Sequence, residues 1–320
     1  MRTTLAALAS AVLAAATPAL AQDTYPAKPV RFIVPFPATG PLDIMARLYA
    51  QKLGERWGKS AIAENRPGAT GTIGADAVAK AVPDGYTLLF TVDLPIVMAP
   101  ALMKPPYDPK ADLVPIAGVG ETMNMLVVHP SAGVSTLAEL VAAAKAKPGA
   151  LTFSSAGTAS PGHLCVEMLK SAAGVDLTHV PYKGAAPAMQ AALAGEVSMF
   201  CGPITQGLPH VKSGKLRALG VTGAKASPLL PELKPLAATY SGLVVSNWYA
   251  VFAPPKTPPA VLAFLRAELK RTYDDPDVRK RLESVGMDPL WLEPAQVTAA
   301  IDRDLTKWSG VVKAANIKAE

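Results

Sequence analysis

Segments with the residue pattern of β-strands alternate with segments of helical pattern along most of this chain, and that alternation constrains the fold more than any other feature. Apolar or alternating runs predict strands at VRFIVPF (30–36), YTLLFTV (86–92) and ALTFSS (150–155). Helical periodicity is found at 44–57, 74–81, 163–173 and 186–194, and a fifth helix is expected after an N-cap at Ser135 or Thr136. Repeated strand–helix alternation with short loops predicts an α/β fold with largely parallel sheets.

The chain changes character from Pro258 onward, where two long stretches of helical periodicity replace the alternation. These stretches are PPAVLAFLRAELKRTYDDPDVRKRLESVGM (258–287) and EPAQVTAAIDRDLTKWSGVVKAANI (293–317). Both begin beside prolines, which are favoured in the first turn of a helix. We expect these helices to cover a sheet rather than to form a separate unit.

The first 21 residues have the pattern of a secretory signal peptide. Arg2 precedes an apolar run at 5–16, and Ala19-Leu20-Ala21 is a small-residue cleavage site. A membrane anchor is less favoured, because the run is shorter than the ~20 residues that span a bilayer. We expect a mature, released protein that begins at Gln22 and lies in the periplasm. The formal charge of the full chain, +6, suits small anionic ligands better than nucleic acid.

Two cysteines, Cys165 and Cys201, are the whole cysteine content. In an oxidising compartment they could form one disulfide, or they could be two buried free thiols. Their spacing does not decide between these alternatives.

No catalytic signature is present, so an enzyme is the weaker functional class. The sequence has no G-x-S-x-G, H-E-x-x-H or C-x-x-C motif, and its four histidines lack metal-ligand spacing. GATGTIG (68–74) follows the second predicted strand, SAIAENR (60–66), and lacks an acidic ribose partner, so it indicates a tight turn rather than a dinucleotide site. We therefore predict no cofactor and no metal.

Two strand-to-helix loops have the composition of anion sites. Such loops present free backbone N–H groups and the positive end of a helix dipole. The first lies in RFIVPFPATGPLDIMARLYAQKL (31–53), where Asp43 could be a helix cap that orders the loop. The second, TFSSAGTASPGHL (152–164), is rich in small hydroxyl residues, which suit holding a carboxylate better than cleaving one. The alternative for the second loop is an ordinary polar loop.

Six segments, spread over nearly the whole chain, together resemble the Bug proteins. They are YPAKPVRFIVPFPATGPLDIMAR, ENRPGATGTIGADAVAKAVPDGYTLL, SSAGTASPGHL, VPYKGAAPAMQAALAGEV, LRALGVT and WYAVFAP. The Bug proteins are periplasmic solute-binding components of tripartite tricarboxylate transporters. The resemblance implies a type II periplasmic binding-protein fold with two α/β lobes and a ligand cleft between them. The expected lobes are 22–125 with 247–320, and 126–246.

The resemblance also implies a small carboxylate ligand, held by the two strand-loop-helix elements. The expected binding residues are Phe36, Ala38, Thr39, Asp43, Thr91, Asp93, Ser154, Ser155, Gly157, Thr158, Ser160, His163 and Tyr182. The expected partners are this ligand and membrane transporter subunits, and the protein is expected to be a monomer. A stand-alone sensor for a signalling protein is the alternative. A hydrolase using Ser155 and His163 is the least favoured, because no third residue orients the pair.

Two departures from the family pattern bear on the ligand. PFPATGPLD (35–43) has Thr39 and Pro41 where glycines are usual and Leu42 where a hydroxyl residue is usual, which removes one backbone donor and adds apolar surface. TVDLPIVMAP (91–100) places Asp93 at a cleft-facing position. Either Asp93 faces a nitrogen donor of the ligand, or it points away into a capping role.

Overall fold

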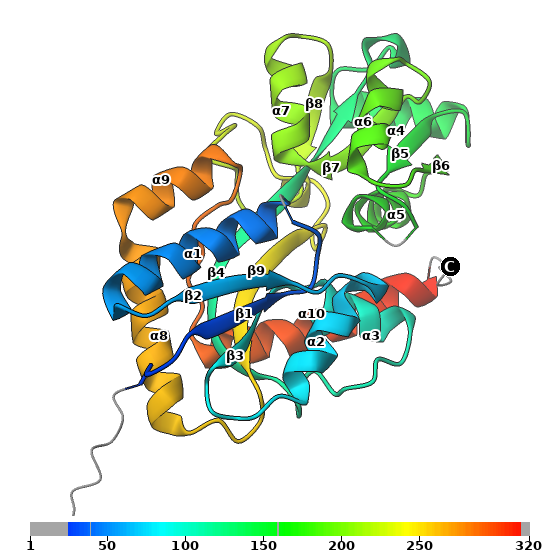
Figure 1. The fold of residues 1–320 in the computed structure, drawn as a ribbon. Helices are drawn as coiled ribbons and strands as arrows, with labels where there is room; N and C mark the ends of the chain where they lie inside the picture. Colours follow the sequence, from blue (N-terminus) through cyan, green and yellow to red (C-terminus); the bar gives the residue numbers. More distant parts are fainter. Residues whose placement is uncertain (1–24, 39, 159, 315–320) are drawn as a thin grey trace, which may run out of the picture.

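Two α/β lobes joined by two strands form this protein (Figure 1). A computed structural model describes residues 25–38, 40–158 and 160–314. The expected signal peptide and its cleavage point before Gln22 lie outside these residues. Within the described part, no helix is long and apolar enough to cross a membrane.

The first lobe contains three strands, five longer helices and one short helix. They are β1 (Val30–Val34), α1 (Pro41–Trp57), β2 (Ala61–Asn65), α2 (Thr72–Ala79), β3 (Thr87–Val92), α3 (Ala99–Leu102), α8 (Pro259–Asp274), α9 (Pro276–Ser284) and α10 (Pro294–Ala314). The second lobe contains α4 (Leu137–Ala146), β5 (Thr152–Ser155), α5 (Pro161–Ala173), β6 (Thr178–Pro181), α6 (Ala185–Leu193), β7 (Met199–Pro203), α7 (Ile204–Lys212) and β8 (Arg217–Val221).

The strands β4 (Val114–Val128) and β9 (Ser246–Ala253) connect the lobes. β4 pairs with β9 through Met123, and with β7 from Asn124 onward. One hydrogen-bonded path therefore runs through both lobes in the order β2-β1-β3-β9-β4-β7-β5-β6. The expected lobe boundaries, after residue 125 and before residue 247, lie beside this change of partner and stay a prediction.

The sheets are mixed rather than largely parallel. β1 is parallel to β2 and β3, and β5 is parallel to β6 and β7, as the strand–helix alternation predicts. β4 and β9, however, run antiparallel to their neighbours. Both crossing strands are reached by connections other than a simple strand-helix-strand unit, so the parallel rule does not apply to them.

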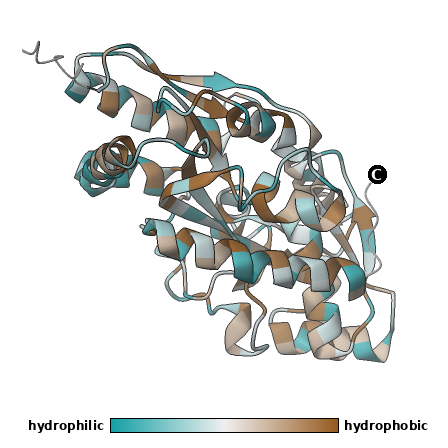
Figure 2. Cartoon of the chain, turned by 90° about the horizontal axis from the view of Figure 1, so that it is seen from below, coloured by the Kyte–Doolittle hydropathy of each residue, from teal (hydrophilic) through white to brown (hydrophobic). Residues whose placement is uncertain are grey.

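Alternation along the strands divides the core into layers. Phe32 and Val34 of β1 face the cluster covered by α1, α8 and α9, whereas Ile33 faces the opposite cluster with α2 and α10. In the second lobe, Leu126 and Val128 of β4 continue the cluster that contains Ile33, while its other face packs against α6 and α7. Seen from below, helices carry hydrophobic and hydrophilic sides (Figure 2), as expected of helices that cover a sheet.

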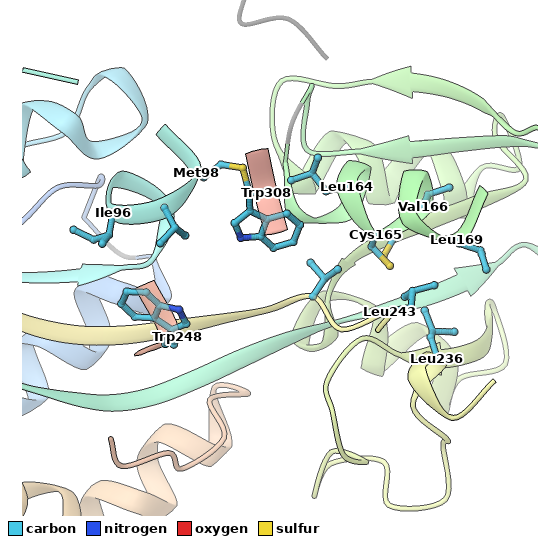
Figure 3. Packing of buried hydrophobic residues seen from close by; sticks show 14 of the residues in the cluster. Ile96, Met98, Leu164, Cys165, Val166, Leu169, Leu236, Leu243, Trp248 and Trp308 are labelled. Atoms are coloured by element: carbon cyan, nitrogen blue, oxygen red, sulfur yellow. The ribbon is translucent and has the colours of Figure 1, made fainter. Parts of the chain in front are cut away.

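One hydrophobic cluster spans both lobes on the side of α10. The Trp308 side chain of α10 lies between Met98 of the first lobe and Leu164 of α5 (Figure 3). Trp308 is 3 % exposed. The lobes are therefore packed together along this side.

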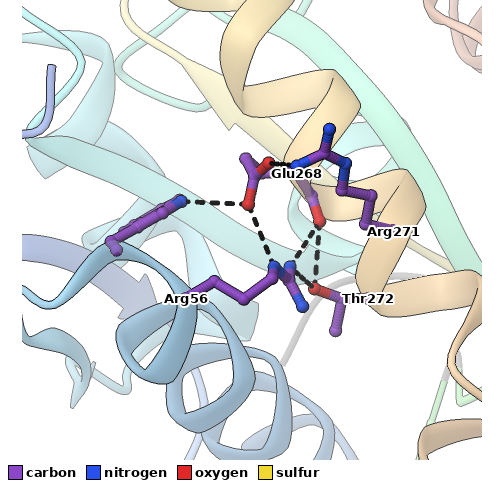
Figure 4. A network of polar contacts seen from close by, with 5 residues as sticks. Arg56, Glu268, Arg271 and Thr272 are labelled. Carbon is purple, nitrogen blue, oxygen red and sulfur yellow. Dashed lines mark hydrogen bonds and ion pairs between the residues drawn. The ribbon is translucent and has the colours of Figure 1, made fainter. Parts of the chain in front are cut away.

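A buried polar network fixes α1 to α8 within the first lobe (Figure 4). Glu268 accepts hydrogen bonds from Arg56 Nε at 3.0 Å, Trp57 Nε1 at 3.2 Å and Arg271 at 2.9 Å. Arg56 also donates to the Glu268 carbonyl and to Thr272. This anchoring holds the helix whose first turn belongs to the first predicted loop.

The observed helices agree with most predicted segments but begin earlier. α1 and α5 start at Pro41 and Pro161, about one turn or less before the first residues predicted. The stretch after Pro258 forms α8 and α9, separated at Asp275, whose side chain caps α9. GATGTIG forms the turn from β2 to α2, with a φ of 88° at Gly71.

Candidate functional site

A cavity of about 530 Å³ lies between the lobes. The first lobe contributes Phe36, Pro37, Ala38, Gly40, Pro41, Leu42, Val92, Leu94, Val285 and Gly286. The second lobe contributes Ala156, Ser160, Pro161, Gly162, Ala185, Cys201, Gly202, Pro203, Ile204 and Thr205. The crossing strands contribute Thr122, Met123, Asn124, Asn247 and Tyr249.

Four helices direct their N-terminal ends to this cavity. Its lining includes the N-cap or first-turn residues of α1, α5, α6 and α7. The first N–H groups of a helix have no intrahelical partner, and the helix dipole makes this end positive. Among the described residues, the lining contains no aspartate, glutamate, lysine, arginine or histidine. The arrangement can therefore attract an anion without a charged side chain.

The N-terminus of α5 is held close to β7 by the absence of a side chain at Gly162. A Cβ atom at Gly162 would lie 2.0 Å from the carbonyl oxygen of Cys201. Ser160 is the N-cap of α5, and its Oγ accepts a hydrogen bond from His163 N. These two contacts set where the first turn of α5 meets the cavity.

The crossing strands form the polar wall of the cavity. The Thr122 and Tyr249 hydroxyls lie 3.2 Å apart and share a hydrogen bond. Asn124 is 5 % exposed, and its Nδ2 is buried without a hydrogen-bond partner. A buried donor without a partner is costly, so this N–H group is suited to an acceptor that enters the cavity.

Asp93 lies at the same wall but is not among the described residues that line the cavity. It is 2 % exposed, and its Oδ1 accepts a hydrogen bond from Asn247 Nδ2 at 2.8 Å. Burial raises the pKa of the Asp93 carboxyl to about 8, while the hydrogen bond from Asn247 opposes this shift. The contact of Asp93 is therefore with Asn247, a pairing that neither sequence-based alternative for Asp93 contained.

The predicted residues of the first loop lie in two places. Phe36 and Ala38 line the cavity, whereas Thr39 lies outside the described residues. Asp43 is not the N-cap of α1, because that position is Gly40. Asp43 is buried beneath the loop, where Arg47 Nε lies 2.8 Å from Oδ2.

Asn65 shows how Asp43 still orders the first loop. Its Nδ2 donates both to Asp43 Oδ1 at 2.8 Å and to the Phe36 carbonyl at 3.0 Å. Asp43 therefore supports the loop from below and does not appear in the cavity lining. Thr91 is also inside the fold, fully buried, with its hydroxyl donating to the Val92 carbonyl.

In the second loop, only Ser160 of the predicted residues lines the cavity. Ser154 is fully buried, and its hydroxyl donates to the Ala188 carbonyl at 2.8 Å. Ser155 is also fully buried, with its Oγ 2.7 Å from His179 Nε2. The predicted residues that the cavity lining does not include are Asp43, Thr91, Asp93, Ser154, Ser155, Gly157, Thr158, His163 and Tyr182.

Two histidines of this lobe, His163 and His179, stack on each other. The rings of His163 and His179 lie 3.9 Å apart and nearly parallel, and the Phe153 ring packs against both, at 6.1 Å and 4.7 Å. Burial and the neighbouring His163 lower the pKa of His179 to about 4. Ser155 thus contacts His179 instead of His163, and its buried hydroxyl offers no exposed nucleophile.

The two cysteines are free thiols, both fully buried. A hydrogen bond with Cys165 and then burial raise the pKa of Cys201 well above its usual value. Within the described ranges, no group of three or more potential metal ligands is found.

Several lining residues were missed by the sequence-based prediction, chiefly Asn124, Asn247, Thr122 and Tyr249. Asn124 and Asn247 lie within otherwise apolar strand segments, MNMLVVH (123–129) and VSNWYAVFAP (245–254). An amide in an apolar strand is a signal for a buried polar contact. The prediction instead concentrated on the strand-to-helix loops.

Comparison with known proteins places this chain in one family. The family model described as tripartite tricarboxylate transporter family receptor matches residues 45–317. Protein BugT of Bordetella pertussis is 35 % identical over 299 residues, covering 92 % of this chain and 92 % of BugT. The family match therefore includes every described cavity-lining residue after residue 45.

Solved structures confirm the prediction of a periplasmic binding-protein fold. The periplasmic binding protein BugD has a TM-score of 0.75 and 33 % identity, with 92 % of this chain and 100 % of that chain covered. The R. palustris protein Rpa4515, solved with adipate, has a TM-score of 0.78 and 31 % identity, covering 92 % and 99 %. The chain therefore belongs to the tripartite tricarboxylate transporter receptor family, whose members are solute-binding receptors.

Proposed function

We propose that this protein binds a small carboxylate-bearing ligand in the cavity between its lobes. The carboxylate would lie against the first turns of α1, α5, α6 and α7, which supply positive helix ends and free N–H groups. The observation that carries this proposal is the convergence of four helix N-termini on a cavity whose described lining has no charged side chain.

A second observation, independent of the helices, also favours an acceptor-bearing ligand. Asn124 Nδ2 is a buried donor without a partner in the cavity wall. The remaining lining is mainly apolar, with Phe36, Leu42, Leu94 and Ile204 among its members. This combination favours a small organic acid with an apolar body, and the structural relative Rpa4515 was solved with adipate.

The test is a thermal-shift screen of the mature protein against dicarboxylates, amino acids and aromatic carboxylates. A ligand at a hundred times its Kd adds about 2.7 kcal/mol to the free energy of unfolding, which raises the Tm of a protein of this size by several degrees. If no carboxylate stabilises the protein while other solutes do, the proposal is wrong.

Two variants then locate the ligand. Asn124→Ala should weaken binding by about 1–3 kcal/mol, because the N–H group that meets the ligand is removed. Ser154→Ala is the matched control, since the Ser154 hydroxyl bonds the Ala188 carbonyl and is not in the cavity lining. It should lower stability but leave affinity unchanged. If Asn124→Ala and the wild type bind the ligand equally well, the ligand does not contact this wall of the cavity.

We further infer that the receptor delivers its ligand to membrane transporter subunits after the lobes close about β4 and β9. Family membership supports this role. The same proposal includes a monomer, lobe boundaries after residue 125 and before residue 247, and a signal peptide cleaved before Gln22. Deleting the gene should abolish uptake of the ligand. Normal uptake with a lost transcriptional response would favour the sensor instead.

The proposed receptor carries out no chemistry on its ligand and needs no cofactor. The full burial of Ser155 and the free thiols of Cys165 and Cys201 support this inference. Incubation of the protein with its ligand should return the ligand unchanged by mass spectrometry. A product of altered mass would contradict the proposal.

A further inference from the structure

Asp93 and Asn247 form a hydrogen-bonded pair at the cavity wall, with only Asn247 in the lining. Asn247 Nδ2 donates to Asp93 Oδ1 at 2.8 Å, and Asp93 is 2 % exposed. Asn247 lies on β9 directly opposite Thr122 of β4, which also lines the cavity. Among the described residues, the side chain that links the buried carboxyl to the cavity is therefore the Asn247 amide.

Only a protonated Asp93 allows this amide to turn its NH2 group toward the cavity. An ionised carboxylate can only accept, so the Asn247 NH2 group must point to it and the carbonyl oxygen is left for the cavity. A protonated carboxyl can donate to the amide oxygen, and the NH2 group is then left for the cavity. An asparagine amide can turn over with little change in shape, so both arrangements fit the same space.

Asn124 provides a fixed donor on the same wall. Its backbone is held to Thr222 on both sides, with Asn124 N donating to Thr222 Oγ1 at 2.8 Å and Thr222 N donating to Asn124 O at 2.9 Å. Its Nδ2 is buried and has no partner. The wall thus offers one donor and one acceptor when Asp93 is ionised, and it can present two donors to a ligand only when Asp93 is protonated.

We propose that the Asp93–Asn247 pair is a proton-operated selector for the second end of the ligand, and that Asp93 is a positioning residue in it. This inference rests on the proposed function, in which the first carboxylate lies at the helix N-termini. A second carboxylate requires two donors and therefore the protonated pair. A carboxamide, which both donates and accepts, fits either state.

The charged groups around Asp93 come from α10 and β9. Asp304 raises and Lys307 lowers the pKa of Asp93, and Arg303 and the Tyr249 hydroxyl also face it. Burial is the largest influence, and the resulting pKa is about 8. Both states of the pair are therefore populated near pH 8.

Adipate and its monoamide, 6-amino-6-oxohexanoate, are matched probes for the selector. Between pH 6.5 and pH 9 the protonated fraction of Asp93 falls about tenfold for a pKa of about 8. Calorimetric titration should therefore show that the affinity for adipate falls about tenfold over this range, while that for the monoamide changes less than about threefold. In Asp93→Asn, the ratio of the two affinities should not change with pH. A constant ratio in the wild type would overturn the proposal.

Asp288→Asn is the matched control variant. Asp288 is 7 % exposed, burial raises the pKa of its carboxyl to about 6, and it is not in the cavity lining. It should keep the fall in adipate affinity seen in the wild type. The same loss of pH dependence in both variants would mean that a general effect of buried carboxyls, rather than the Asp93–Asn247 pair, is responsible.

A titration without ligand separates this inference from the proposed function. The side-chain NH2 signals of Asn247 in the NMR spectrum, identified by their loss in Asn247→Ala, should shift with a midpoint near pH 8 in the wild type. They should not shift in Asp93→Asn. If adipate binds at neither pH, adipate is not a ligand of the proposed site. The NMR titration of Asn247 then tests the selector by itself. Unchanged Asn247 signals from pH 6.5 to 9 would refute it.

Discussion

Replacing Gly162 by alanine should displace the first turn of α5 and weaken ligand binding. The added Cβ atom would lie 2.0 Å from the Cys201 carbonyl oxygen and 2.9 Å from its carbonyl carbon. Both neighbours are backbone atoms of β7, so rotation of a side chain cannot relieve the contact. To restore a separation beyond 3.0 Å from the oxygen, the helix end must move by about 1 Å.

The substitution should lower both the free energy of unfolding and the affinity for the ligand. Overpacking at a buried site typically lowers the free energy of unfolding by about 1–3 kcal/mol. A carboxylate held by the N–H groups of this turn loses at least one well-formed hydrogen bond, which weakens binding about tenfold or more. Calorimetric unfolding gives the first quantity, and titration with adipate at pH 6.5 gives the second.

Gly174→Ala is the matched control at the opposite end of the same helix. Gly174 has a φ of +63°, and nothing lies within 4 Å of an added Cβ atom. The strain of this backbone conformation should lower stability by about 1 kcal/mol. Affinity should remain that of the wild type. Equal affinities in Gly162→Ala and Gly174→Ala would refute the assignment of the α5 N-terminus to the binding site.

Three further predictions concern stability, each measured by calorimetric unfolding. Glu268→Gln should lower the free energy of unfolding by about 2–4 kcal/mol, because three donors lose an anionic acceptor. Asp274→Asn, on the same helix, removes an exposed ion pair and should leave the free energy of unfolding within about 0.5 kcal/mol of the wild type. His179 binds its proton more weakly in the folded state, so stability should fall by about 1–3 kcal/mol as the pH is lowered from about 6.5 to about 4, and His179→Gln should reduce this slope. Trp308→Ala should lower the free energy of unfolding by about 3–5 kcal/mol. Trp308→Phe should lower it much less, because Trp308 Nε1 has no hydrogen-bond partner. Similar losses in both variants would show that the indole N–H contributes to stability.

The strands and helices of each lobe are largely predictable from the sequence because local signals mark them. Prolines at the first turns of α1 and α5 and apolar runs in β1 and β3 agree with the observed elements. α7 was not predicted, since it is short and contains Pro209, which disfavours a helix interior.

β4 shows why long-range packing limits such predictions. The apolar run MNMLVVH (123–129) predicts only the C-terminal part of this strand, yet β4 begins at Val114. Gly118 and Gly120 in its first half are unfavourable strand residues on local grounds. In the fold they allow close approach of Leu292 and Met45, where a Cβ atom would lie 2.8 Å and 2.7 Å from these side chains. Because these contacts are with residues distant in the sequence, a local sequence pattern cannot predict that the glycines belong to a strand.

The same limit applies to the cavity wall. Asp93 is identifiable in the sequence as an acidic residue at the end of an apolar strand, but its contact is with Asn247, 154 residues later. That separation spans the whole second lobe, and only the return of the chain through β9 brings the two together. An acidic residue beside a ligand would repel a dicarboxylate at every pH above its own pKa. The same residue behind an amide instead makes the wall adjustable, because the amide can present either its oxygen or its NH2 group to the cavity. In the proposed selector, the ligand preference therefore depends on a pair of residues rather than on the charge of Asp93 alone.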